Sequence, residues 1–88
     1  MVYLTKEEQT FEKLVIVLRG MRNITEAEAR DILRETRWTI YDNIEYMYKQ
    51  DASLNEMIEC AISIFSDYTG LSGRNYIADF IDWGFVKW

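Results

Sequence analysis

Apolar residues recur three or four positions apart along most of this chain, which is the spacing of an amphipathic helix. The pattern is clearest from Leu54 to Tyr68, where Ile58, Ala61 and Phe65 continue the same stripe. The 88 residues include no proline, so no segment carries an obligatory helix breaker. The pattern predicts an all-α, compact single-domain bundle of about five helices, over residues 6–19, 26–37, 40–50, 54–69 and 73–83.

Signals for helix ends support these boundaries. Three Ser or Thr residues are each followed three positions later by glutamate, which is the spacing of a capping box. In a capping box the hydroxyl accepts a backbone N–H and the glutamate accepts the N–H of the cap residue. The expected boxes are Thr5 with Glu8, Thr25 with Glu28 and Ser53 with Glu56; weaker caps are expected at Thr39 and Ser72, and glycine stops at Gly20, Gly70 and Gly84.

The composition is typical of one folded domain over residues 1–88. Hydrophobic residues make up 49% of the chain, which favours a packed core over disorder. The single cysteine, Cys60, excludes an intrachain disulfide and is typical of a reducing compartment. No signal peptide is evident, and the longest aliphatic run, Leu14 to Leu18, is far shorter than the roughly 20 residues of a membrane span. We expect a cytoplasmic protein that does not enter the membrane.

The formal net charge of −5 comes from the second part of the chain. Residues 1–37 hold seven basic and seven acidic side chains, whereas residues 38–88 hold three basic and eight acidic ones. An acidic surface repels nucleic-acid phosphate and attracts basic surfaces. The alternative is that the acidity only keeps the domain soluble.

Signals of catalysis are lacking. The chain has no histidine, and Cys60 therefore has no partner of the Cys–His kind. The pairs Asp79/Asp82 and Asp42/Glu45 have a spacing that could hold a metal, but the same spacing describes any acidic helix face. We therefore expect no enzyme, no catalytic residues, no metal and no cofactor.

Acidic and aromatic side chains together indicate protein binding. We predict a small acidic module that acts by occupying a surface of another protein. If that protein binds nucleic acid, the module could compete for its basic groove, and its size and charge are those of small inhibitors made by phages and other mobile elements. The expected contact residues are Asp42, Glu45, Tyr46, Glu56, Glu59, Asp67, Asp79, Asp82 and Trp83.

The exposure of three aromatic residues stays open at this level. Trp38, Tyr46 and Trp88 could either anchor a partner or pack against the bundle. We expect the apolar C-terminal residues 85–88 to fold back over the core.

Two other functions remain as alternatives. Residues 25–33 and 38–44 are spaced like a helix-turn-helix, with a basic ridge of Arg30, Arg34 and Arg37 to contact DNA, although direct nucleic-acid binding is disfavoured by the acidic residues on the predicted reading helix. The same arginines could instead form salt bridges, for example from Glu26 to Arg30. The other alternative is a homo-oligomeric structural protein, such as a homodimer, with an aromatic subunit interface.

Overall fold

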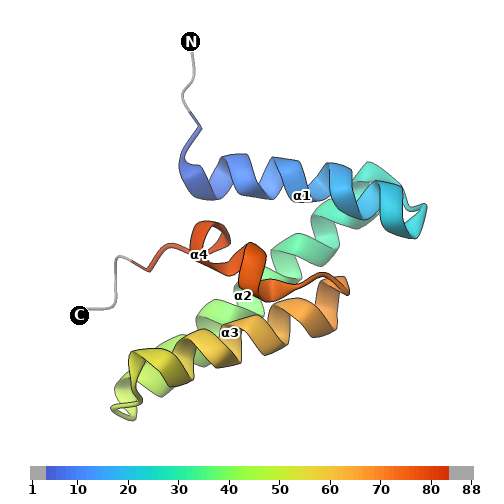
Figure 1. Ribbon diagram of the computed structural model, residues 1–88. Helices are drawn as coiled ribbons and strands as arrows, with labels where there is room; N and C mark the ends of the chain where they lie inside the picture. The colour runs from blue at the N-terminus through green and yellow to red at the C-terminus, as the bar shows by residue number, and fades with distance from the viewer. Residues whose placement is uncertain (1–3, 84–88) are drawn as a thin grey trace.

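Three long helices and two short helical segments follow one another along the chain (Figure 1). This computed structural model describes residues 4–83, and within that range the chain forms helices and connections but no strand. The predicted all-α, compact fold is confirmed. The elements are α1 (Lys6–Arg22), α2 (Glu26–Lys49), α3 (Leu54–Thr69), the 3-10 helix η1 (Gly73–Asn75) and α4 (Ile77–Phe80).

Helix α1 begins at the predicted capping box and ends later than predicted. Thr5 Oγ1 accepts the backbone N–H of Glu8 at 3.2 Å, and the Glu8 carboxylate accepts the N–H of Thr5 at 3.4 Å. The expected stop at Gly20 is wrong, because Asn23 takes the left-handed conformation at φ 52° and its N–H donates to Arg19 O. Gly20 therefore lies inside the helix, where a glycine is tolerated at some cost in stability.

Helix α2 is one continuous helix where the sequence pattern predicted two. It begins at the predicted Thr25 capping box and continues through Trp38 and Thr39 without a turn. The Thr39 hydroxyl, expected to cap a new helix, instead donates to Glu35 O at 2.8 Å, one turn back within the same helix. The buried positions keep one helical phase across the predicted break, so packing favours continuity; they are Ala29, Leu33, Thr36, Ile40 and Ile44.

Helix α3 has the predicted bounds. Ser53 caps it by accepting the backbone N–H of Glu56 at 3.2 Å, but the reciprocal bond to the Ser53 N–H does not form. The Ser53 hydroxyl donates to the Glu56 carboxylate instead. Gly70 ends the helix in the left-handed conformation at φ 76°, as expected for a glycine stop.

The single helix predicted over residues 73–83 is wrong. The chain forms η1, then α4, and leaves helical geometry at Ile81. Ser72 makes no side-chain capping bond. Gly73 packs so closely on α3 that an added Cβ would lie 2.8 Å from Ile62 O, so tertiary packing fixes this turn. The predictions for Gly84, residues 85–88 and Trp88 fall outside the described residues.

The short α4 closes the core between α1 and α3, both of which pack against α2 (Figure 1). Phe80 of α4 contacts Phe11 of α1, with ring centroids 6.4 Å apart, and Phe65 of α3 edge-on at 5.3 Å. Ile77 and Ile81 are buried beside it. Burying these side chains is worth about 1.5–3 kcal/mol each, which fixes the segment that leads to Trp83.

Candidate partner-binding surfaces

Two large aromatic side chains are exposed on one face of α2. Trp38 is 68% exposed and Tyr46 is 65% exposed. They lie eight residues apart, which is about 12 Å along a helix. Asp42 and Glu45 lie between them and are exposed as well. We call these four residues the outer face of α2.

The helical phase of the core explains why this face is free. Ile40 and Ile44 are completely buried and point toward the other helices. At 100° per residue, Trp38 and Asp42 lie on the opposite side of the same helix. The question of exposure that the sequence left open is therefore answered for Trp38 and Tyr46, and Trp88 lies outside the described residues.

The outer face of α2 has an acidic character that its basic neighbours only partly offset. Lys49 Nζ lies 3.3 Å from Glu45, one turn along the helix. Arg34 Nη1 lies 3.6 Å from Asp31 near the other end. Both pairs are well exposed, and exposed pairs of this kind hold their partners weakly. A basic group from outside could therefore replace Lys49.

The other predicted contact residues lie away from this face. Helix α3 carries one group of acids, in which Glu56 belongs to the Ser53 cap and Glu59 accepts two bonds from Arg74, at 3.1 and 3.2 Å. The segment that ends the described chain carries the other group, in which Asp79 lies 3.5 Å from Lys6. The nine residues thus form three groups: Asp42, Glu45 and Tyr46 on α2; Glu56, Glu59 and Asp67 on α3; and Asp79, Asp82 and Trp83 at the end.

The three arginines of the predicted ridge have different surroundings. Arg30 forms a bidentate pair with Glu12 of α1, at 2.9 and 2.8 Å, and lies 3.7 Å from Glu26. The side-chain hydrogen bonding from Arg30 lowers the pKa of Glu12 from its ordinary value. The side chain of Arg34 is 65% exposed. Arg30 is thus committed to joining α1 and α2.

Arg37 points inward. Its guanidinium lies over two aromatic rings, 5.0 Å from the centroid of Phe11 and 4.6 Å from that of Phe80. Its Nη2 donates to Glu7 O at 3.1 Å and to Phe80 O at 3.0 Å, while Nε is buried without a hydrogen-bond partner. Desolvation lowers the pKa of Arg37, although an arginine keeps its charge in proteins. This side chain holds α1, α2 and α4 together.

The helix-turn-helix arrangement is wrong for this chain. Both predicted helices, residues 25–33 and 38–44, fall within the single helix α2 and its cap. A recognition helix needs a turn that sets it at an angle to the preceding helix. No such turn exists between Glu26 and Lys49.

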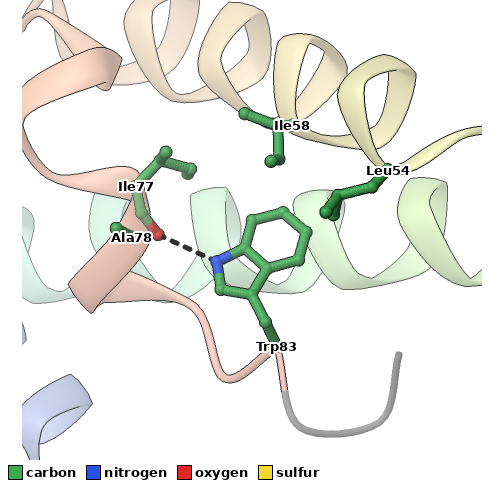
Figure 2. Close-up of a pocket in the computed structure, with 5 residues that line it drawn as sticks. All are labelled: Leu54, Ile58, Ile77, Ala78 and Trp83. Atoms are coloured by element: carbon green, nitrogen blue, oxygen red, sulfur yellow. Dashed lines mark hydrogen bonds between the residues drawn. The ribbon is translucent and has the colours of Figure 1, made fainter. Parts of the chain in front are cut away.

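Trp83 lines an apolar pocket that the sequence did not reveal. The pocket has a volume of about 220 Å³ and lies between the start of α3, α4 and the indole ring (Figure 2). The indole N–H donates to Ile77 O at 3.4 Å. We call this cavity the Trp83 pocket, and the residues that line it are Leu54, Ile58, Ile77, Ala78 and Trp83. Trp83 itself was predicted as a contact residue, but its neighbours depend on where α4 lies.

Comparisons with protein-family models, with curated proteins and with solved structures found no match for this chain. Among the described residues, no helix has the length and apolar character to cross a membrane. Over the same part of the chain, no three acidic, Cys or His side chains are grouped as metal ligands would be. Burial raises the pKa of Cys60 above its ordinary value, which disfavours the reactive thiolate.

Proposed function

We propose that this protein is a small acidic binding module that acts by occupying a surface of a partner protein. One observation carries the proposal: Trp38 and Tyr46 are 68% and 65% exposed on one helix face, with Asp42 and Glu45 between them. Trp and Tyr dominate the energetic centres of protein interfaces. Their rigid rings offer a large contact area for little loss of conformational entropy.

The partner surface that fits this face is basic. Between residues 38 and 83 the only basic side chains in the sequence are Lys49 and Arg74, against eight acidic ones. Both are already in ion pairs, with Glu45 and with Glu59. A partner arginine can stack on an exposed aromatic ring while it donates to a neighbouring carboxylate.

A basic groove that normally holds nucleic acid has this chemistry. The proposal therefore extends to an inhibitor of the kind made by phages and other mobile elements, which acts in the cytoplasm and competes with nucleic acid for the groove. The carboxylates of α2 would stand where phosphates stand. A homodimer through the same face is disfavoured, because it would bring two sets of carboxylates together.

The test compares capture by matched variants of the full chain. Immobilised wild-type protein, Trp38→Ala, Tyr46→Ala and the control Ile16→Ala are each incubated with lysate from the source cells, and bound proteins are quantified by mass spectrometry. Ile16 is the matched control because it is 72% exposed but lies on α1. All three substitutions remove exposed side chains, so the fold is expected to persist.

We expect a partner that binds the wild type and Ile16→Ala equally, and binds Trp38→Ala and Tyr46→Ala at least about tenfold less, as for a hot-spot residue. The captured partner should release bound nucleic acid when the wild type is added. Equal capture by all variants would remove the outer face of α2 as the binding surface. If the partner keeps its bound nucleic acid when the wild type is added, the proposal that the two compete for one groove is wrong.

A further inference from the structure

We propose that the Trp83 pocket receives one large apolar side chain from a basic segment of the partner protein. This inference rests on the proposed function, that the protein binds another protein, but it concerns a surface separate from the outer face of α2. The pocket supplies a place for an anchor residue, which tight interfaces commonly use.

The volume of the Trp83 pocket fits a single side chain. An engineered protein cavity of about 150 Å³ binds benzene, so a pocket of about 220 Å³ has room for one aromatic ring or one branched aliphatic side chain. Sites for larger organic ligands run from about 300 to 1,000 Å³. The pocket is open to solvent at its rim, where Leu54 and Ala78 are exposed.

The chemistry of the walls also favours an apolar side chain. The walls of the pocket are aliphatic or aromatic. The indole N–H of Trp83 is directed at Ile77 O and not into the open space (Figure 2). Small-molecule sites usually place several polar groups to orient the ligand, and the side chains of this pocket do not supply them. An apolar group gains from leaving water here, at about 25 cal/mol per Å² of buried apolar area.

The pocket is held in place by the core. Ile77 is buried, and α4 is fixed through Phe80, which packs on both α1 and α3. The Asp82 N–H donates to the Tyr41 hydroxyl at 2.7 Å, which ties the residue before Trp83 to α2. A site formed before binding costs less ordering when the partner arrives.

The charge around the pocket indicates that the incoming segment is basic. Asp79 and Asp82 lie on the same short stretch of chain as Ala78 and Trp83, and Asp82 is exposed. The Asp79 side chain is 45% exposed, and its carboxylate lies 3.5 Å from Lys6, a distance typical of a weak surface pair. Lysine or arginine beside the anchor residue would be attracted to these carboxylates, whereas a second copy of this acidic chain would be repelled.

The probe for this site is a defined peptide. It is a capped nonapeptide of glycine and lysine, with two lysines on each side of a central phenylalanine. A second peptide carries alanine at the centre. Binding to the ¹⁵N-labelled full chain is followed by NMR through the indole N–H resonance of Trp83. We expect a saturable shift with the phenylalanine peptide and binding at least about tenfold weaker with the alanine peptide, which is about 1.4 kcal/mol.

Two matched variants locate the binding. Ala78→Leu places a larger side chain at the rim of the pocket, whereas Ala27→Leu makes the same change at an exposed position on α2. We expect Ala78→Leu to weaken the phenylalanine peptide about tenfold or more and Ala27→Leu to leave it within about twofold. Raising the salt concentration should weaken binding, because screening reduces the attraction between lysine and carboxylate.

Several results would overturn the inference. These are no shift with the phenylalanine peptide, equal binding of the two peptides, or no effect of Ala78→Leu. Binding of free benzene or indole without binding of the peptide would identify a small-molecule pocket. If the phenylalanine peptide binds only to the double variant Phe85→Ala, Trp88→Ala, the chain's own C-terminal residues are the occupant of the pocket. If the protein dimerises with rising concentration and Ala78→Leu abolishes the dimer, a second copy of the chain is the occupant. Trp38→Ala should leave peptide binding unchanged. The proposal for the outer face of α2 and the proposal for the Trp83 pocket are therefore tested independently.

Discussion

Replacing Arg37 tests the packing that joins α1, α2 and α4. Each of its two ring contacts, at 5.0 and 4.6 Å, is worth about 0.5–2 kcal/mol. Each bond from Nη2 to a backbone carbonyl adds about 1.5 kcal/mol, as a hydrogen bond from a charged group. The buried Nε without a partner offsets about 1–3 kcal/mol of this sum. We therefore expect Arg37→Ala to lower the free energy of unfolding by about 3 kcal/mol.

Urea unfolding followed by circular dichroism measures this loss. With an m-value of about 1 kcal/mol/M, the midpoint of Arg37→Ala should fall by about 3 M. Arg37→Lys should lose roughly half as much, because lysine keeps the charge but not the planar fork. The control is Arg34→Ala, one turn earlier on α2 with a side chain 65% exposed, which should change stability by less than about 0.5 kcal/mol. If Arg37→Ala and Arg34→Ala have the same midpoint, the reasoning about Arg37 is refuted.

Four further predictions concern Gly20, Gly73, Glu12 and Cys60. Gly20→Ala should raise the thermal midpoint, by about 0.5–1 kcal/mol in free energy, because Gly20 lies within a helix and an added Cβ meets nothing within 4 Å; no gain would contradict this. Gly73→Ala should cost about 1–3 kcal/mol in urea unfolding, because its Cβ would meet a backbone oxygen of α3 at 2.8 Å; an unchanged midpoint would contradict that contact. The Arg30 hydrogen bond lowers the pKa of Glu12, so this pair stabilises the fold above the ordinary glutamate pKa and its contribution is lost as the pH falls through the folded-state value. Glu12→Gln should accordingly lose less stability than the wild type when urea unfolding at about pH 6 is compared with about pH 3, and equal losses would refute this. Burial raises the pKa of Cys60, so iodoacetamide at about pH 8 should alkylate it more slowly in the folded protein than in urea, and equal rates by mass spectrometry would refute this.

The starts of the three long helices were predictable because their capping bonds are local. Thr5 and Thr25 form complete capping boxes within four residues of sequence, and Ser53 forms the first bond of one. The stop at Gly70 was predictable for the same reason, since its left-handed conformation follows from the absence of a side chain. At Gly20 the same residue type gave a wrong stop, because Asn23 takes the left-handed position three residues later.

The breaks that were predicted wrongly depend on distant contacts. Thr39 has the residue type of a cap, but the buried Ile40 and Ile44 continue the stripe of the preceding turns and keep α2 whole. The apolar spacing predicted one amphipathic helix over residues 73–83, but the close packing of Gly73 on α3 determines the turn at that residue. Neither outcome follows from spacing alone, because both depend on which elements meet in space.

The same distinction between local position and distant contacts explains which parts of the candidate surfaces could be predicted. Tyr46 could be assigned to a polar helix face from its position relative to Ile40 and Ile44, and the structure exposes it. Arg37 was assigned to a basic ridge because it lies on the same flank of the predicted helix as Arg30 and Arg34, but its guanidinium contacts two aromatic rings and two backbone carbonyls instead of solvent. The Trp83 pocket needed the position of α4, which the sequence did not predict.

The unbroken α2 also bears on how the domain opens. Its N-terminal half is tied to α1 through Arg30 and Arg37, while its C-terminal half lies along α3 (Figure 1). Two shorter helices with a turn between them could unfold one at a time, each exposing its own amides to hydrogen exchange. A single helix that packs on both α1 and α3 has no turn at which one part could unfold alone. Backbone amides near Ile40 should therefore exchange only when the whole domain unfolds. The cooperativity of the domain is thus built into one helix.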